Sequence, residues 1–414
     1  MFNMKKLFFT FILTLGLCCS CSNDDTPSIP DRPVPNNITE LESRVKKEIS
    51  EAGNSFANNF MLEMSRQVPN QNMMVSPMSL QIALGMLSNG ADEEALQEIT
   101  DVLGLNNYSL EMMNSYYYAL SLLLEQETED FTLKLANAIW VQDDYPVGKT
   151  FIDNNRAIFN ATIEDIDFGQ AEKAKQRINQ WASKATAETI KELSCNINSS
   201  VRVLLANACY MKGKWTLPFN KVNTQKEDFT NQDGSSTKVD MMRVTNKFNY
   251  RNNVDESYQM VELPYSDESF SMVIALPKDG MTLDEILPEI DWNNDLDGTT
   301  VSVQLPKFKI EANYPDEVKK AVTTMGIKRI FTGGSLPGIN EELFVGQITQ
   351  DTYITVDEVG TKASAVTTIV VDGALEPGSG VSDIPVIRMD SPFVFAIREN
   401  STGAVLFTGK VVKM

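Results

Sequence analysis

The residue types that usually carry out catalysis are scarce in this 414-residue chain. It contains no histidine, which excludes Ser–His–Asp and Cys–His catalysis and metal sites with imidazole ligands. Three of its five cysteines, Cys18, Cys19 and Cys21, crowd the N-terminus. The other two, Cys195 and Cys209, fit neither a zinc site nor a redox pair. These reaction types are therefore excluded, and we expect no cofactor and no metal ion.

The most unusual stretch runs from Asp357 to Asp383. It follows a predicted strand, passes through Gly360 and enters a run of small and β-branched residues, 363–371, with no proline before Pro377. Loops usually carry turn residues every few positions, whereas this run is suited to a strand. The pattern predicts either a segment that can enter a sheet or an ordinary edge strand followed by a surface loop.

Composition and charge limit the partners of the protein. With 42% hydrophobic and 22% charged residues, the composition is that of an ordinary globular protein. The formal net charge is -20, and the first twenty residues contribute Lys5 and Lys6 but no acid, so the remaining body is more negative still. A surface this negative argues against nucleic acid as a partner. No linker interrupts the chain after residue 38, so we expect one large domain over residues 38–414.

The N-terminus has the pattern of an export signal. Lys5 and Lys6 precede an apolar stretch, 7–17, that is too short to span a bilayer. The cysteines that follow resemble a bacterial lipoprotein cleavage site, in which the cysteine after the cut is acylated. We favour Cys21, because a small residue precedes it and an acidic segment follows, and Cys18 is the alternative.

Residues 1–20 are thus predicted to be a lipoprotein signal peptide, and residues 21–37 an acidic, proline-rich tether. On this interpretation the protein is exported and anchored in the outer membrane by its N-terminal lipid, on the cell surface. The alternative is a soluble secreted protein.

Helices dominate the first half of the chain and strands the second, which indicates an α+β fold rather than alternating βαβ units. Helical patterns cover 38–66, 77–90, 91–103, 110–125, 170–192, 281–290 and 316–325. Strand patterns cover 131–142, 201–212, 260–265, 270–276, 300–310, 347–356, 391–397 and 404–412.

Four motifs occur in order and well spaced over about residues 40–414. In chain order they are Asn72-x-x-Val75-Ser76-Pro77-x-Ser79-Leu80, Leu205-Ala206-Asn207-Ala208-x-Tyr210-x-Lys212-Gly213-x-Trp215, Asp357-Glu358-Val359-Gly360-Thr361-x-Ala363-Ser364-Ala365, and Ser391-Pro392-Phe393-x-Phe395 with Phe407-x-Gly409-Lys410-Val411. Together they resemble motifs of the serpins. The first resembles the shutter helix of that family, the second its central strand with the breach tryptophan, the third the hinge of its reactive loop, and the fourth its C-terminal hairpin.

The resemblance implies a serpin fold with three β-sheets, eight or nine helices and an exposed reactive-centre loop. It also implies a monomer that is not an enzyme but inhibits a target protease by a suicide mechanism. The protease attacks the loop and forms an acyl-enzyme, the cut loop inserts into the central sheet, and the protease is trapped in a covalent complex at the far pole.

The residues after the hinge suit such an insertion, because a central strand has no space for bulky side chains and no place for a missing N–H. Gly360 supplies the bend, and the residues beyond it are small or β-branched. They would form two alternating rows, one with Ala363, Ala365, Thr367 and Ile369, the other with Ser364, Val366, Thr368 and Val370. Lys362 departs from the family pattern, and we expect its side chain to face solvent.

Counting from Glu358 as the family does places the reactive bond at Ala374–Leu375. Cuts after Val371, Gly373 or Leu375 remain open, because the loop beyond is long. No lysine or arginine lies between Ala363 and Ile387, which argues against a trypsin-like target. We expect an elastase-like or subtilisin-like serine protease, or a papain-like cysteine protease.

The resemblance also assigns a polar latch and an ion pair near the opening point of the sheet. The latch would contain Ser76, Ser79 and Asn207, with Gln350 where the family often has histidine. Lys307 and Glu358 would form an ion pair near the top of the sheet, and Trp215 and Asn72 belong to the same group of motif residues.

Two other functions remain as alternatives. One is a non-inhibitory serpin that acts as a chaperone or carrier, which the hinge composition disfavours. The other is a solute-binding surface lipoprotein, which only the sequence of the N-terminal segment supports.

Overall fold

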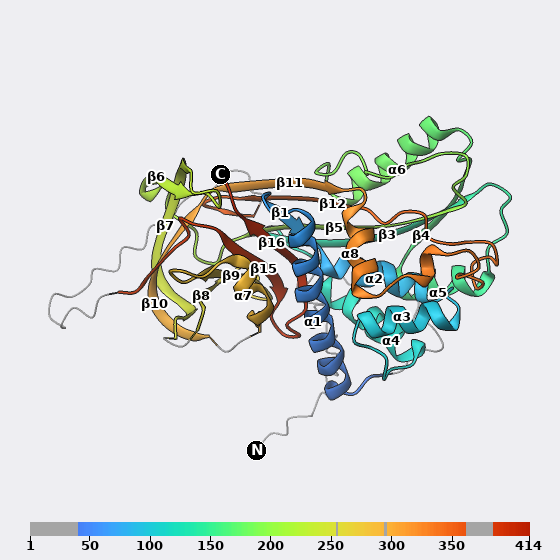
Figure 1. Cartoon of the computed structure of the whole chain (residues 1–414), viewed down its shortest axis with the longest axis horizontal. Coiled ribbons are helices and arrows are strands. Elements are labelled where there is room, and N and C mark those ends of the chain that lie inside the picture. Colours follow the sequence, from blue (N-terminus) through green and yellow to red (C-terminus); the bar gives the residue numbers. More distant parts are fainter. Residues whose placement is uncertain (1–39, 254–255, 294–295, 362–383) are drawn as a thin grey trace, which may run out of the picture.

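The computed structural model describes residues 40–253, 256–293, 296–361 and 384–414, and within these ranges the chain forms eight α-helices and sixteen strands (Figure 1). The helices are α1 Ser43–Gln67, α2 Pro77–Ser88, α3 Glu93–Val102, α4 Leu110–Leu124, α5 Lys149–Phe159, α6 Ala171–Ala185, α7 Leu283–Ile286 and α8 Glu317–Met325. None of the helices in these ranges is both long enough and apolar enough to cross a bilayer.

The strands form two sheets. A seven-stranded sheet has the order β11-β12-β13-β5-β3-β2, with β4 paired to β3, and a nine-stranded sheet has the order β1-β16-β15-β9-β8-β7-β10-β14, with β6 paired to β7. The first contains β2 Gln126–Glu127, β3 Phe131–Gln142, β4 Thr162–Ile166, β5 Val203–Lys214, β11 Phe308–Tyr314, β12 Gln350–Val356 and β13 Gly360–Thr361. The second contains β1 Met73–Val75, β6 Gln225–Thr230, β7 Ser236–Arg251, β8 Tyr258–Pro264, β9 Phe270–Pro277, β10 Asp297–Pro306, β14 Val386–Arg388, β15 Phe393–Glu399 and β16 Val405–Val411.

The expected α+β class is confirmed, but hydrogen bonds join the strands in two sheets rather than three. The reason is the length of β7. Its first part pairs with β6 and its middle with β10, whereas its end, from Asn249 to Arg251, pairs with β8. One long strand thus connects two groups of strands that would otherwise count as separate sheets.

Helix α2 lies between the two sheets and forms the floor beneath β5. The helix begins with the predicted N-cap. The Ser76 hydroxyl accepts a hydrogen bond from the Ser79 N–H, and Pro77 occupies the first turn. Eleven of its twelve residues are buried, as the apolar sequence predicts. On the opposite face α6 covers the seven-stranded sheet, so the sheet is a layer between α6 and α2 (Figure 1).

Several boundaries differ from the sequence expectation. Helix α6 ends at Ala185, seven residues early, and the unpredicted helix α5 buries Phe151, Ile158 and Phe159. The predicted strand over 347–356 begins only at Gln350. Gln350 pairs with Tyr314, the last residue of β11, so residues 347–349 have no neighbouring strand to pair with in the described part of the sheet.

Candidate functional site: an open central sheet

The central feature of the seven-stranded sheet is a gap between β5 and β12. In the described residues these two strands share no ladder, and only the two residues of β13 lie between them. Thr361 pairs with Gly213 of β5 and with Val356 of β12, so the gap is one strand wide at that end. Beyond β13 it continues as a cavity of about 720 Å³ lined by β5, β12 and the floor of α2.

Gly360 closes the upper end of the gap by a close approach of two backbones. A Cβ atom at this position would lie 2.1 Å from the carbonyl oxygen of Gly213 and 2.7 Å from the Cα of Lys214. The turn before it is held by the Asp357 carboxylate, which accepts hydrogen bonds from the N–H groups of Val359 and Gly360 at 2.8 and 3.3 Å. Glycine is therefore required here for space, and the hinge is fixed against β5.

The Trp215 side chain, at the end of β5, anchors the same turn. Its indole N–H donates to the Asp357 carbonyl at 3.0 Å, and its ring stacks on Tyr265 with centroids 4.8 Å apart. The Tyr265 hydroxyl lies 2.8 Å from the Thr361 hydroxyl. Because both of these groups are buried, Thr361 faces the protein core rather than solvent.

Glu358 is buried beside the hinge with two partners for its carboxylate. Lys307 Nζ lies 2.8 Å from Oε2, and the Thr224 hydroxyl donates to Oε1 at 2.9 Å. Burial alone would raise the pKa of Glu358, but the hydrogen bonds from Lys307, the backbone and Thr224 outweigh it and hold the pKa below its ordinary value. The carboxylate side chain is only 4% exposed, so this pair is shielded from solvent far better than a surface ion pair.

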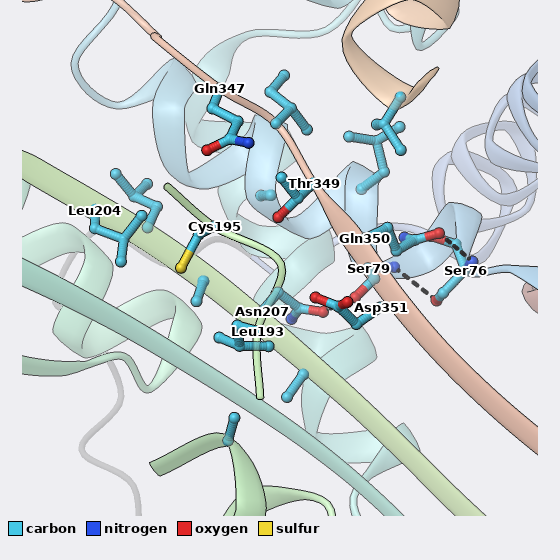
Figure 2. A pocket seen from close by; sticks show the side chains of 18 of the residues that line it. Ser76, Ser79, Leu193, Cys195, Leu204, Asn207, Gln347, Thr349, Gln350 and Asp351 are labelled. Carbon is cyan, nitrogen blue, oxygen red and sulfur yellow. Dashed lines mark hydrogen bonds between the residues drawn. The ribbon is translucent and has the colours of Figure 1, made fainter. Parts of the chain in front are cut away.

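Ser76, Ser79, Asn207 and Gln350 meet beneath the middle of the gap (Figure 2). The Gln350 amide accepts from the Ser76 N–H and donates to the Ser76 carbonyl, both at 2.8 Å. The Ser79 hydroxyl donates to the Asn207 side-chain carbonyl. The amide of Gln350 thus pairs with the Ser76 backbone as a neighbouring strand would, and it holds β12 to the start of α2.

Asn137 belongs to this network, although sequence reasoning missed it. It lies directly opposite Asn207 on β3, accepts from the Asn207 amide at 2.6 Å and donates to the Phe159 carbonyl at 2.7 Å. A signal was present, because the tetrapeptide Leu-Ala-Asn-Ala occurs in both predicted strands, at 135–138 and 205–208. An asparagine in the middle of a buried strand needs a polar partner.

Asn72, grouped with these residues from its motif, lies apart from them. Its side chain binds the C-terminal segment, accepting from the Val412 and Lys413 N–H groups and donating to the Lys413 carbonyl at 2.7 Å. The structure therefore corrects this assignment, since Asn72 binds the C-terminal segment and not the residues that line the gap.

Several predicted site residues lie outside the described ranges. These are the loop residues Ala363, Ser364, Ala365, Val371, Gly373, Ala374 and Leu375 and the lipidation candidates Cys18 and Cys21. Burial raises the pKa of both remaining thiols, Cys195 and Cys209, which makes them poor nucleophiles. The described ranges also hold no group of three acidic or cysteine side chains arranged to bind a metal ion.

Comparison with known proteins gives a consistent result. A family model described as Serpin (serine protease inhibitor) matches residues 51–414. The chain is 30% identical to Serpin I2 from Homo sapiens over 365 residues, which cover 82% of this chain and 85% of the relative. It is 31% identical to Iripin-2 from Ixodes ricinus over 373 residues, with 86% and 92% coverage.

Solved structures agree with these relatives. The chain superposes on Serpin48 of the insect Tenebrio molitor with a TM-score of 0.78 at 28% identity, covering 91% of this chain and all of the other. For native protease nexin-1 with heparin the TM-score is 0.76, again at 28% identity, with 89% of this chain and all of that chain covered.

Proposed function

The chain belongs to the serpin family, and we propose that it inhibits an endopeptidase irreversibly, by cleavage of its own loop and insertion of the cut loop into the gap between β5 and β12. Serpins are typically protease inhibitors rather than enzymes, and they act on target proteases. The observation that carries the proposal is the position of Thr361, which already pairs with both sides of a gap one strand wide.

The register of β13 supports the proposal, because it defines where each following residue would lie after insertion. Continued without a bulge, it would bring Ala363 between Met211 and Ile354, and Ala365 between Cys209 and Thr352. Side chains alternate along a strand, so these alanines would face the core as Thr361 does. The floor of α2 lies on that side, and small side chains suit it.

The same register would bring a hydrogen-bonding side chain next to the polar latch of Asn207 and Gln350. Thr367 would lie between Asn207 and Gln350, and its hydroxyl group can both donate and accept. The amide groups that hold the gap in the present structure would therefore remain hydrogen-bonded after insertion. A buried polar group that kept no partner would oppose the transition.

We propose a target protease that cuts after small or apolar residues, at Ala374–Leu375 or one of the neighbouring bonds after Val371 or Gly373. The loop sequence supports this, since no cation lies between Ala363 and Ile387. Elastase-like and subtilisin-like serine proteases fit this requirement, and papain-like cysteine proteases are a second class to test.

We also propose that the mature protein is a lipoprotein, acylated at Cys21, with Cys18 as the alternative, and displayed from the outer membrane by the tether 21–37. The support is the sequence pattern alone. Mass spectrometry of the protein extracted from membranes tests it. An N-terminal peptide that begins at an acylated Cys21 is expected, and a soluble protein without lipid would overturn this part of the proposal.

The inhibitory function is tested by mixing the protein with elastase and separating the products on a denaturing gel. We expect a covalent band at the summed mass of the two proteins, and mass spectrometry of the released C-terminal fragment identifies the bond that was cut. Cleavage without a complex would indicate a non-inhibitory serpin. Resistance to elastase, subtilisin and papain alike would leave a binding role for the lipoprotein instead.

A further inference from the structure

The turn between β8 and β9, residues 265–269, is part of the support of the hinge. The Tyr265 hydroxyl lies 2.8 Å from the hydroxyl of Thr361, and the Tyr265 ring stacks on Trp215. The Thr216 hydroxyl, just after β5, donates to the Tyr265 carbonyl at 2.8 Å. A movement of this turn would therefore shift the groups that hold Thr361 in the gap.

Asp267 lies in the middle of this turn as a buried acid. Both of its side-chain oxygens are shielded from solvent, and among the described residues neither has a hydrogen-bond partner. Burial of an unpartnered carboxylate is unfavourable. The next residue, Glu268, has a φ of 59°, a left-handed conformation that favours glycine. Two unfavourable features thus lie side by side, close to the hinge.

The charged groups around this carboxylate do not compensate it. Within the described part of the chain, the one charge that shifts its pKa belongs to another acid, Glu399 at the end of β15. Glu399 is buried, and its oxygens accept from the Ser401 N–H and from the N–H and hydroxyl of Thr402. On the side of β5, the nearest cation, Lys214, forms its ion pair with Asp130.

These surroundings make Asp267 a weaker acid in the folded protein. Burial raises its pKa from 3.8 to about 6, the N–H groups of Ser269 and Phe270 offset part of the effect, and the charge of Glu399 adds to it. Between these two values the folded protein holds a proton that the unfolded chain has released, so stability falls as the pH rises toward 6. Tyr265 stays neutral over this range, because burial raises its pKa.

We infer that Asp267 is a proton switch that loosens the hinge as the pH rises from mildly acidic to neutral. When protonated, the carboxyl group is neutral and tolerates its buried position. When it releases its proton to solvent, the carboxylate needs water, and it gains water by an outward movement of the turn that withdraws Tyr265 from Thr361 and Trp215. This inference rests on the proposed function, in which the cut loop enters through the hinge, and it implies faster insertion at neutral pH.

The test compares Asp267→Asn with the unaltered protein, because an amide has nearly the shape of the carboxyl group and does not ionise. Asp267→Ser is a second variant that cannot ionise, and Glu268→Gln, which removes the exposed acid of the same turn, is the matched control. Hydrogen exchange of a peptide that covers β13 is followed by mass spectrometry between pH 5 and 7.5, without a protease. The ratio of the rates of two proteins at the same pH removes the intrinsic pH dependence of exchange.

We expect the exchange rate of the unaltered protein, divided by that of Asp267→Asn, to rise about tenfold between pH 5 and 7.5. This is the increase expected if the carboxylate regains its ordinary pKa when the turn opens. Asp267→Ser should give the same result, and Glu268→Gln should follow the unaltered protein. With elastase, the rate of complex formation relative to Asp267→Asn should rise over the same range.

An exchange ratio that does not change with pH would overturn the switch, and so would a Glu268→Gln variant that behaves like Asp267→Asn. The proposed function fails separately. If the unaltered protein traps no protease while its exchange ratio still rises with pH, the switch stands and the inhibitory function does not.

Discussion

Asn137 on β3 and Asn207 on β5 lie directly opposite each other, and the Asn207 amide donates to the Asn137 side-chain carbonyl over 2.6 Å. The pair continues the contact from Ser79 on α2 to the Phe159 carbonyl at the end of α5. A chain of polar contacts thus connects β3 and β5 to α2 and α5, at the level where the gap would accept Thr367 in the proposed insertion.

Replacing Asn207 by alanine should destabilise the native state. The Ser79 hydroxyl and the Asn137 carbonyl would both lose their partner inside the protein, which costs roughly 1–3 kcal/mol. Thermal unfolding measures the effect. Asn313→Ala, an exposed position on β11 of the same sheet, serves as the control and should change little. Equal unfolding midpoints for the two variants would contradict a stabilising role for the polar contacts of Asn207.

Thr361→Arg should convert the inhibitor into a substrate. Thr361 is 4% exposed and its hydroxyl contacts Tyr265, so a guanidinium group cannot enter this position without losing its water. The denaturing gel with elastase should show cleaved inhibitor and free protease in place of the covalent complex. Lys362→Arg should leave the complex intact, because alternation along an inserted strand would turn residue 362 to the opposite side from residue 361. An unchanged stoichiometry in Thr361→Arg would refute insertion through β13.

Lys362→Glu should accelerate insertion. By the register of β13, residue 362 would lie between Lys212 and Thr355, and Thr355 itself pairs with Lys309 on β11. A lysine there faces like charge, whereas a glutamate would face opposite charge, a difference of about 1 kcal/mol or more across the strand pair. The gain in the rate of complex formation should shrink as the ionic strength is raised toward 1 M, because salt screens exposed charges. A gain in the rate of complex formation that does not change with ionic strength would exclude the charge at residue 362 as its cause.

The Lys307–Glu358 pair predicts acid sensitivity at the hinge. The pKa of Glu358 is lower in the folded protein than in the unfolded chain, so the stabilisation is complete above pH 4.5 and is lost as the pH falls through the folded value. The thermal midpoint of the unaltered protein should therefore fall more steeply below pH 4.5 than that of Glu358→Gln. Parallel curves would show that the carboxylate contributes no pH dependence.

Lys410 predicts a further rise of stability with pH, in the alkaline range. Its ammonium group is buried against Ser65 and Pro69, and burial lowers its pKa from 10.5 to about 8. Between these values the unfolded chain holds a proton that the folded protein has lost, so raising the pH stabilises the fold, by about 3 kcal/mol for a shift of this size. Lys410→Met should lack this rise, and Lys413→Met, an exposed neighbour, should keep it. The measurement is the free energy of unfolding of all three proteins between pH 7.5 and 11.

Local features of the fold were predictable from the sequence, because caps and periodicity act over a few residues. Ser76 and Pro77 gave the start of α2, and the apolar pattern gave β3 over Phe131–Gln142 without error. The composition after Gly360 predicts a segment suited to a strand, which lies outside the described residues, and the expected ion pair of Lys307 with Glu358 is present at the hinge. Each of these depends on short-range chemistry or on a motif carried by the residues themselves.

The tertiary structure alone decided how strands far apart in the sequence are placed. The late start of β12 at Gln350 follows from the end of β11, and the position of Asn137 opposite Asn207 follows from the register of β3 and β5. The contact of Ser194 with Asp351 joins residues 157 positions apart. No local pattern encodes such distances, since they arise when the helices and both sheets pack together. The sequence by itself thus predicts a segment suited to a strand, whereas only the packing of the helices and sheets created the gap between β5 and β12.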